Sequence, residues 1–363
     1  MKKNLIALAV LAASGVASAQ SNVTLYGLVD AYVGTSRIKL SSPGFSANST
    51  RQTVVDSGGF NTSRFGLKGS EDLGGGLKAN FMLEAGFNVD SGATNSGNST
   101  GSYVNPFTGV PSSSVFSRQS WVGVSGGFGE VRVGKMWTPY DEVKGTGAAA
   151  FDANIFAPAT GVWLSNSYQD RPGNALYYAT PSFSGFSAAA MYSFGENKNV
   201  VPNTDAGKIV SVNVQYANGP FAVALSHQNE KVNGSVAATK YTQLNGSWDF
   251  GPAKLLAAYG QVKDTSIFNF STAAATSVAV DKSREYQIGV DVPLGAVTLS
   301  TGLSRAKIDT SVGEVKSTGF GLAAKYDLSK RTFLYTGLQL AKNELSTTEV
   351  KTDTFAVGVQ HKF

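Results

Sequence analysis

The stretch TDTFAVGVQHKF, residues 352–363, ends the chain and alternates between two kinds of residue. One parity holds Phe355, Val357, Val359, His361 and Phe363, and all of these except His361 are apolar. A period of two residues is that of a β-strand with one apolar and one polar face. Because chain ends fray and unpaired strand edges aggregate, an amphipathic strand that ends on an aromatic indicates a sheet closed on itself. Taken alone, this stretch fits the edge of a β-sandwich equally well.

The other end of the chain has the three parts of a secretory signal. Lys2 and Lys3 form a basic segment, an apolar run follows over residues 5–13, and Ala17-Ser18-Ala19 precedes Gln20. This order is typical of a signal peptide, and the apolar run is too short to span a bilayer. We therefore expect residues 1–19 to be the signal and residues 20–363 to form a single exported domain.

Composition excludes several classes of protein. The chain has 41 Gly, 42% hydrophobic residues and no cysteine, so no disulfide framework stabilises it. Removing Lys2 and Lys3 from the formal charge of +5 leaves +3, which is too little for a nucleic-acid-binding protein. No later apolar run is long enough for a membrane helix, whereas a membrane β-barrel shows only modest average hydropathy because its two faces cancel.

Short turns rich in Gly or Pro repeatedly precede alternating runs. Gly74-Gly75-Gly76 precedes residues 77–87, and Gly251-Pro252 precedes residues 254–259. The opposite connections are longer and more polar, and we expect them at residues 36–61, 90–117, 137–173, 196–207, 231–240, 264–282, 308–316 and 342–351. Short turns on one side and long loops on the other predict an all-β, antiparallel up-and-down transmembrane barrel of about 16 strands. A β-sandwich is the alternative, but aromatics near the strand ends favour the two girdles of a membrane barrel.

Several stretches resemble the β-proteobacterial general porins. They are VTLYGLVD at residues 23–30, SRFGLKGSEDLGGGLK at 63–78, RQSWVG at 118–123, RPGNALYY at 171–178 and VGVQHKF at 357–363. The resemblance covers the whole exported domain in order. It implies an outer-membrane homotrimer of 16-stranded barrels, each with a water-filled pore that the third extracellular loop narrows. It also implies that Phe363, with His361 and Val359, forms part of a signal for the barrel assembly machinery. Outer-membrane lipids and lipopolysaccharide are the expected surroundings.

The third loop should be residues 137–173. Loops of this length are usually functional or disordered, yet Phe151, Ile155, Phe156, Val162 and Trp163 make its middle too apolar for disorder. A segment packed against the inner wall of the barrel explains both features. Ala148-Ala149-Ala150 is a possible start of a helical turn.

Charged side chains at the narrowest point set the selectivity of a wide pore. Alternation places Phe65 and Leu67 toward lipid, so Arg64 and Lys68 face the lumen; Arg132 faces inward by the same rule. The resemblance adds Arg118 and Arg171 to a basic wall with Arg64. Alternation counted from Val122 points Arg118 toward lipid, unless a bulge re-aims it.

The opposing acidic wall should come from the inward loop. Asp141, Glu142 and Asp152 are the candidates, and their spacing does not distinguish among them. Opposed walls would create a transverse field that favours polar solutes. An excess of arginine would give a modest anion preference.

The sequence does not predict an enzyme. The two histidines, His227 and His361, lie far apart with no cysteine, so we expect no metal site and no cofactor. No Gly-x-Ser-x-Gly nucleophile elbow lies between a strand and a helix. The main expectation is passive diffusion of ions and small hydrophilic solutes. The alternatives are a solute-specific channel and, less favoured, an outer-membrane barrel enzyme or an adhesin.

Overall fold

The computed structural model describes residues 22–42, 45–95, 115–195, 207–231, 238–268 and 277–363. The expected signal, residues 1–19, lies outside these residues, as do most of the expected connections at 90–117 and 196–207. Among the described residues, no helix is long and apolar enough to cross a bilayer.

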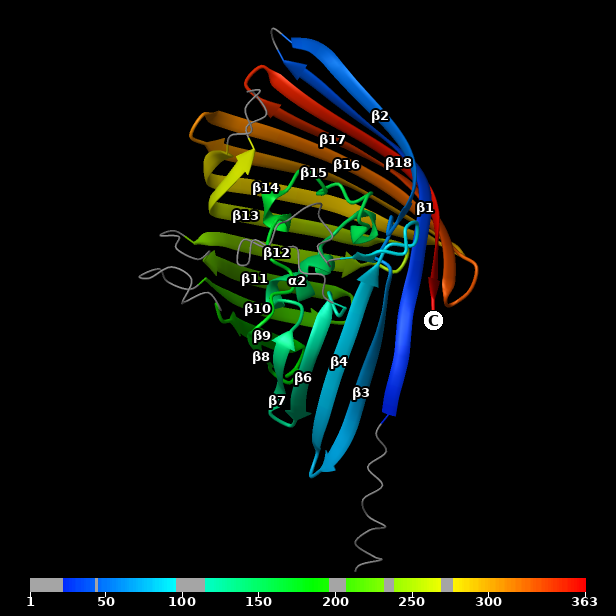
Figure 1. Cartoon of the computed structure of the whole chain (residues 1–363), viewed down its shortest axis with the longest axis vertical. Coiled ribbons are helices and arrows are strands. Elements are labelled where there is room, and N and C mark those ends of the chain that lie inside the picture. The colour runs from blue at the N-terminus through cyan, green and yellow to red at the C-terminus, as the bar shows by residue number, and fades with distance from the viewer. Residues whose placement is uncertain (1–21, 43–44, 96–114, 196–206, 232–237, 269–276) are drawn as a thin grey trace, which may run out of the picture.

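One antiparallel sheet runs through almost the whole described chain (Figure 1). Its first nine strands are β1 (Asn22–Ser42), β2 (Phe45–Ser57), β3 (Arg64–Gly74), β4 (Leu77–Phe87), β5 (Thr94–Asn95), β6 (Gln119–Gly126), β7 (Gly129–Lys135), β8 (Ala175–Ala179) and β9 (Phe186–Ser193). The remaining nine are β10 (Lys208–Asn218), β11 (Phe221–Lys231), β12 (Thr239–Asp249), β13 (Lys254–Phe268), β14 (Ser277–Leu294), β15 (Val297–Thr310), β16 (Gly313–Asp327), β17 (Thr332–Leu345) and β18 (Thr348–Lys362).

These labelled segments make 16 barrel strands in the described part of the chain. β2 and β3 pair with successive parts of β1, so together they form one strand of the wall. β5 and β6 share β4 in the same way. Counting each couple once reduces 18 segments to 16, as the sequence predicted.

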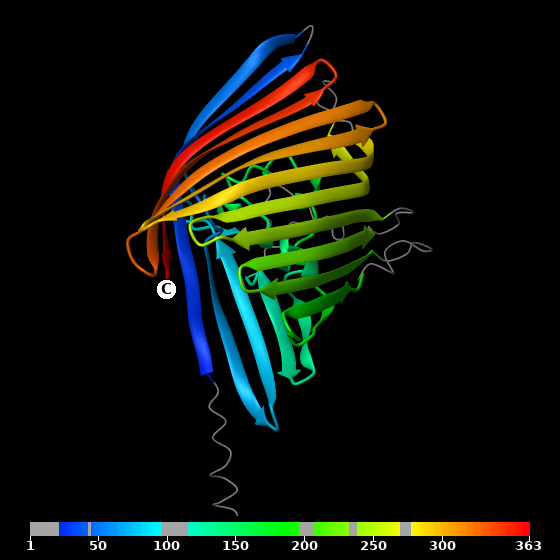
Figure 2. The same ribbon diagram turned by 180° about the vertical axis from the view of Figure 1, so that it is seen from behind.

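The last strand closes the barrel against the first. β18 pairs with β1 from Leu28 opposite Lys362 to Ser41 opposite Glu349. Beyond that ladder, Gly27 and Phe363 exchange two backbone hydrogen bonds of 3.1 Å. The blue first strand and the red last strand lie side by side in both views (Figures 1 and 2). The closed sheet predicted from residues 352–363 is therefore confirmed.

Alternation places the apolar side chains on the outer face. On β18, Val357 is 50% exposed and Val359 is 41% exposed, whereas Gln360 is fully buried inside. Trp248 stacks on Phe250 with ring centroids 5.2 Å apart on the outer surface, near a short turn. Tyr335, near the start of β17, points inward instead, and its hydroxyl donates to Asp30 at 2.6 Å.

Three connections that the sequence predicted as long loops are mostly strand. β15 and β16 are joined by residues 311–312, β17 and β18 by residues 346–347, and β1 and β2 by residues 43–44. Charged residues at these ends occupy the outward parity of strands that continue past the apolar band. Their polarity therefore indicated a loop where the alternation itself had not ended.

Between β2 and β3 the wall is interrupted by an inward fold of the chain. Residues 58–63, between β2 and β3, leave the ladder and enter the barrel. The buried carboxylate of Asp30 accepts hydrogen bonds from the Asn61 amide at 3.0 Å and the Tyr335 hydroxyl at 2.6 Å. The Asn61 side-chain amide donates to Gln360 at 2.8 Å. These hydrogen bonds therefore hold the segment in a fixed position inside the barrel.

Candidate functional site

A long loop between β7 and β8 lies inside the barrel (Figures 1 and 2). It carries four short helical pieces, α2 (Pro139–Glu142), η1 (Lys144–Thr146), η2 (Ala150–Asp152) and η3 (Leu164–Asn166). Thr138 caps α2 by accepting a hydrogen bond from the Asp141 amide at 3.3 Å. The infolded loop predicted at residues 137–173 is confirmed.

Inward-facing polar side chains of the wall hold the backbone of this loop. The Glu285 carboxylate on β14 accepts from the amides of Leu164 at 2.9 Å and Ser165 at 3.1 Å. Glu230 on β11 accepts from the Gln169 amide at 2.6 Å. Buried backbone donors need such partners, so these two glutamates fix the returning half of the loop.

The inner wall is glycine-rich where the loop presses on it. The ideal Cβ of a residue at position 302 would lie 2.5 Å from the Ala149 Cβ, and one at position 319 would lie 1.9 Å from the Pro158 carbonyl oxygen. The glycines of the wall that contact the loop in this way lie on five adjacent strands: Gly260, Gly289, Gly302, Gly319, Gly321 and Gly337. Only the absence of side chains allows this close approach.

Apolar side chains anchor the middle of the loop. Phe156 packs with Phe60 and Tyr335, and Trp163 packs among Val280, Ile308 and residues of β16 and β17. A helical turn, η2, begins at Ala150, and its backbone is left-handed because Ala150, Phe151 and Asp152 all have positive φ. This conformation turns Phe151 toward Phe60, with ring centroids 5.3 Å apart.

Two of the predicted arginines share one wall carboxylate. Glu84 on β4 accepts from Arg118 Nε at 2.7 Å, and Arg64 Nε lies 3.5 Å from the same carboxylate. Arg118 thus faces the barrel interior, contrary to the alternation counted from Val122. It does so because β6 begins one residue later, at Gln119, so the alternation of that strand does not apply to it.

The side chains of Arg118 and Arg171 are nevertheless buried. Their side chains are only 4% and 1% exposed, and they flank the Trp137 ring at 5.4 Å and 4.0 Å from its centroid. Arg171 also pairs with Asp170 at 2.8 Å. The structure thus places both guanidinium groups beside Trp137, and their part in the basic wall stays a prediction.

Arg132 faces the lumen, as alternation predicted. Its guanidinium lies between the rings of Trp121 and Tyr177, 4.7 Å and 4.8 Å from their centroids. It pairs with Glu130 at 2.5 Å and lies 3.7 Å from Glu142. Glu142 therefore neighbours a basic residue of the wall, and its part in an acidic wall stays a prediction.

The three predicted loop acids lie in different surroundings. Asp141 accepts a hydrogen bond from the Tyr168 hydroxyl, and burial raises the pKa of its carboxyl to about 6. Burial likewise raises the pKa of Glu142 to about 7, although a 2.9 Å hydrogen bond from Tyr177 opposes the shift. Asp152 pairs with Lys144 at 3.5 Å. Part of the acidic charge is thus removed near neutral pH.

The remaining predicted residues occupy the ends of the barrel wall. Lys68 lies over the Tyr26 ring, 5.3 Å from its centroid, on the inward face of β3. His361 Nδ1 is 2.8 Å from the Thr332 hydroxyl, and Val359 faces outward. The Phe363 ring fills the space beside Gly27, where a Cβ would meet it at 2.4 Å. The assembly role of these residues stays a prediction.

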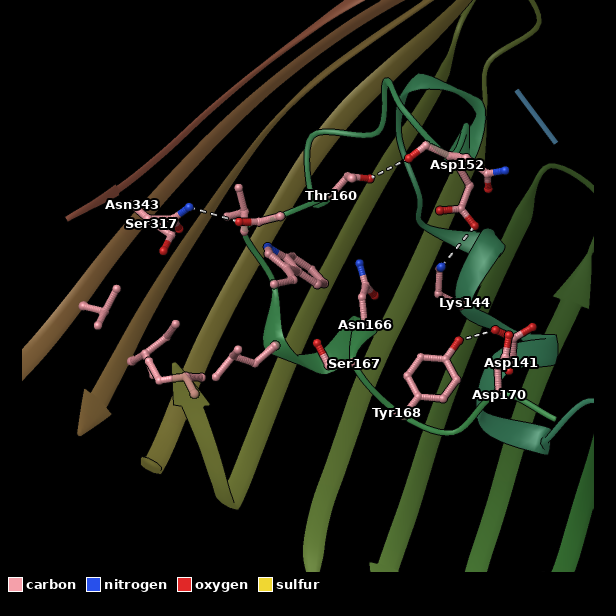
Figure 3. Close-up of a pocket in the computed structure, with 18 of the residues that line it drawn as sticks. Asp141, Lys144, Asp152, Thr160, Asn166, Ser167, Tyr168, Asp170, Ser317 and Asn343 are labelled. Atoms are coloured by element: carbon pink, nitrogen blue, oxygen red, sulfur yellow. Dashed lines mark hydrogen bonds and ion pairs between the residues drawn. The ribbon is translucent and has the colours of Figure 1, made fainter. Parts of the chain in front are cut away.

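A cavity of about 560 Å³ lies between the loop and the wall (Figure 3). Asp141, Lys144, Asp152 and Tyr168 line one side, and Ser317 and Asn343 from the wall line the other. Its volume is within the range of small-molecule sites. Among the described residues, no three His, Cys, Asp or Glu side chains are grouped to hold a metal.

Sequence reasoning missed several residues of this site. Glu84, Trp137 and Lys144 connect the charged groups, while Glu230 and Glu285 position the loop. One signal was available: an acid at the inward parity of a membrane strand needs a partner, and both Glu230 and Glu285 have that parity. The run of inward-parity glycines on β13–β17 was a second signal.

Comparison with known proteins agrees with this architecture. Residues 6–346 match the Gram-negative porin family. The chain is 36% identical to outer membrane porin protein 32 of Delftia acidovorans, over 92% of this chain and 88% of that protein. It is 31% identical to an outer membrane porin protein of Bordetella pertussis over the full length of both.

Solved structures show the same fold. An anion-selective porin from Comamonas acidovorans superimposes with a TM-score of 0.71 at 28% identity, over 94% of this chain and 100% of that chain. OmpT of Vibrio cholerae, in a trimer form, gives a TM-score of 0.64 at 16% identity, over 94% of this chain and 99% of that chain. The chain folds as a closed barrel with an apolar outer face and an infolded loop, and its relatives are outer membrane porins. It therefore belongs to the Gram-negative porin family and is a β-barrel protein of the outer membrane.

Proposed function

We propose that the protein conducts ions and small hydrophilic solutes passively through its barrel, with a modest preference for anions. One observation carries the selectivity: a single carboxylate, Glu84, serves two guanidinium groups, those of Arg64 and Arg118. Lys68 has an aromatic ring as its near neighbour. On the acidic side, the raised pKa values of Asp141 and Glu142 reduce the negative charge. We therefore expect the balance of charge at the constriction to be positive.

The relatives support this proposal. The Comamonas structure is described as anion-selective, and it shares 28% identity with this chain over nearly its whole length. Charged rings at a constriction are the usual source of selectivity in wide pores. Catalysis is no part of the proposal.

The test is the reversal potential of the purified protein in a planar bilayer under a KCl gradient. We expect the sign for anion preference, decreasing as ionic strength rises because salt screens the charges. A cation-selective potential at neutral pH would contradict the proposal.

We infer further that the protein is a homotrimer whose mature chain begins at Gln20 and whose closure is assisted by the barrel assembly machinery. Support comes from the resemblance and from the trimer form of the Vibrio protein, which shares the fold. Conductance that rises in steps of three would agree with this inference, whereas single steps from freshly purified protein would contradict it.

A solute-specific channel is the second candidate. The cavity beside the loop favours it, because carboxylates, amides and hydroxyls line a volume suited to one small solute (Figure 3). Saturable block of the current by one solute, lost in Asn343→Ala, would support this reading. Current that scales linearly with solute concentration would oppose it.

A further inference from the structure

The cavity between the infolded loop and the wall has two unlike sides. Carboxylates of the loop line one side, whereas apolar side chains of the wall and of the returning half of the loop line the other (Figure 3). The carboxylates are those of Asp141, Asp152 and Asp170, and the apolar side chains include Leu164, Ile267, Ile308 and Val315. A molecule that fits both sides carries a charged group and a hydrocarbon part.

The charged side of the cavity is negative. Among the described residues that line it, Lys144 is the one cation, and it already pairs with Asp152 at 3.5 Å. Asp170 pairs with Arg171 at 2.8 Å, but the Arg171 side chain is buried behind the cavity and does not line it. Three carboxylates thus share one lining cation, so this side favours a cationic group.

Asp141 is the carboxylate best placed to receive that group. It accepts a hydrogen bond from the neutral Tyr168 hydroxyl, and Figure 3 shows both side chains at the edge of the cavity. Within the described residues Asp141 forms no ion pair, and Lys144 pairs with Asp152 instead. A shielded carboxylate forms a strong, charge-assisted hydrogen bond with an ammonium group.

Two polar groups on the apolar side lack a partner. Ser317, on β16, is 2% exposed, and Trp163 is 6% exposed. Both residues line the cavity, yet neither Ser317 Oγ nor Trp163 Nε1 has a hydrogen-bond partner among the described residues. Buried polar groups are normally hydrogen-bonded, and an indole N–H can only donate. An oxygen atom on the hydrocarbon part of a bound molecule would satisfy both groups.

The cavity lies on the extracellular side of the loop. Val315, Ser317 and Asn343 are near the ends of their strands that lie far from both chain ends and from the short turns at residues 295–296 and 328–331. In outer-membrane barrels the short turns face the periplasm. A solute that enters from outside therefore reaches the cavity before it passes the loop.

We propose that this cavity binds a small amphiphilic amine that also carries an oxygen atom. The ammonium group pairs with Asp141, the hydrocarbon part lies along the apolar side, and the oxygen atom takes the hydrogen bonds of Ser317 and Trp163. The inference rests on the second candidate function, a solute-specific site in this cavity, and gives that solute a chemical class. It does not depend on the sign of the ion selectivity.

The test is isothermal titration calorimetry of the detergent-purified full-length protein with three probes of nearly equal size. Tyramine carries an ammonium group, an aromatic ring and a hydroxyl. Phenethylamine lacks the hydroxyl, and 3-(4-hydroxyphenyl)propionate has a carboxylate in place of the ammonium group. At pH 7.5 the Asp141 carboxyl, whose pKa is raised to about 6 by burial, is ionised and an alkyl amine is protonated.

Two variants change the two polar ends of the cavity separately. Asp141→Asn removes the charge and keeps an oxygen that accepts from the Tyr168 hydroxyl. Its matched control is Asp249→Asn, which makes the same change in charge at the periplasmic end of β12. The double variant Trp163→Phe with Ser317→Ala removes the two unpartnered groups, so no other polar group of the described protein loses a hydrogen bond.

We expect wild type and Asp249→Asn to bind tyramine equally. Asp141→Asn should bind it roughly tenfold more weakly, because the ammonium group loses its charged partner. The propionate probe should bind wild type more weakly than tyramine does. In the Trp163→Phe, Ser317→Ala variant, tyramine should bind about fivefold more weakly, whereas phenethylamine should bind as it does to wild type.

Four results would overturn the proposal. They are equal tyramine affinity in Asp141→Asn and wild type, tighter binding of the propionate probe than of tyramine, equal binding of tyramine and phenethylamine to wild type, and no saturable tyramine binding up to about 10 mM.

Reversal potentials under a KCl gradient, measured without any amine, separate this inference from the proposed channel. An anion-selective wild type that does not bind tyramine would overturn the inference alone. A protein that binds tyramine as expected but is cation-selective would support the inference and contradict the proposed selectivity. Saturable block by another solute, without tyramine binding, would retain the solute-specific site and overturn its assignment to amines.

Discussion

Glu142 should make the selectivity of the pore depend on pH. Its pKa is raised to about 7 by burial, so it gains a proton as pH falls from 8 to 6. Loss of that negative charge should increase anion preference over this window. Glu142→Gln should show the higher preference already at pH 8 and little change down to pH 6. Reversal potentials at each pH measure this, with Asp249→Asn at the periplasmic end of β12 as the control. A Glu142→Gln protein that keeps the wild-type pH dependence would contradict the prediction.

The same raised pKa has a consequence for stability. The folded state binds the Glu142 proton more tightly than the unfolded chain, whose glutamate pKa is about 4.3. The contribution of this group to the free energy of unfolding therefore falls as pH rises from about 4 toward 7. Glu142→Gln should flatten that part of the stability profile.

Arg64 should contribute directly to anion preference. Its side chain is 27% exposed and it shares Glu84 with Arg118, so Arg64→Gln removes a positive charge without leaving Glu84 unpaired. In water, the interaction energy between a unit charge and a passing ion about 8 Å away is about 0.5 kcal/mol. This energy corresponds to a roughly twofold change in relative permeability. The reversal potential of Arg64→Gln should shift toward cation preference by the amount that this twofold change gives. Arg305→Gln, on the outer face, should leave them unchanged.

At the scale of the elements, Glu285 should act as a positioning residue for the infolded loop. Its carboxylate accepts two backbone hydrogen bonds from Leu164 and Ser165. Glu285→Gln replaces one acceptor with a donor that faces an N–H, which costs about 1–3 kcal/mol. Single-channel current should become noisier and the unfolding temperature should fall. Glu344→Gln, on the outer face, is the control, and a quiet current in Glu285→Gln would argue against the role.

The glycine-rich inner wall should control how far the loop reaches into the lumen. A Cβ at position 302 would lie 2.5 Å from the Ala149 Cβ, so Gly302→Ala should push the loop inward and lower the conductance. Adding Ala149→Gly removes the other methyl group and should restore it. Conductance of the single and double variants in one salt solution checks this. If the double variant conducts no better than Gly302→Ala, the contact with Ala149 is not the cause of the lower conductance.

At the scale of the whole molecule, the last residue should matter for closure. Phe363 exchanges two backbone hydrogen bonds with Gly27, and its ring covers that glycine. Deleting Phe363 removes these bonds at the only seam between the chain ends in the described barrel. The folded fraction, seen as heat-modifiable mobility on a gel, should fall strongly. Phe250→Ala, an exposed aromatic in a periplasmic turn, should fold as wild type does.

Local alternation, together with short turns on one side and longer connections on the other, predicted the barrel. Residues 352–363 and the runs after each short turn show which face of each strand meets lipid, because side chains alternate with a period fixed by the backbone. The same rule placed Arg64, Lys68 and Arg132 inside. It failed at residues 308–316 and 342–351, where outward-facing charges continued a strand and were interpreted as loop.

By itself, then, the sequence determined the strands, their two faces, the inward loop and the charged residues available to the pore. Only the tertiary structure decided that Arg118 and Arg171 lie beside Trp137, that Glu142 neighbours Arg132, and that lysines oppose lysines on the outer face. Alternation is a local property of each strand. Which side chains meet across strands depends on register and on the path of the loop, and closure of the whole sheet fixes both.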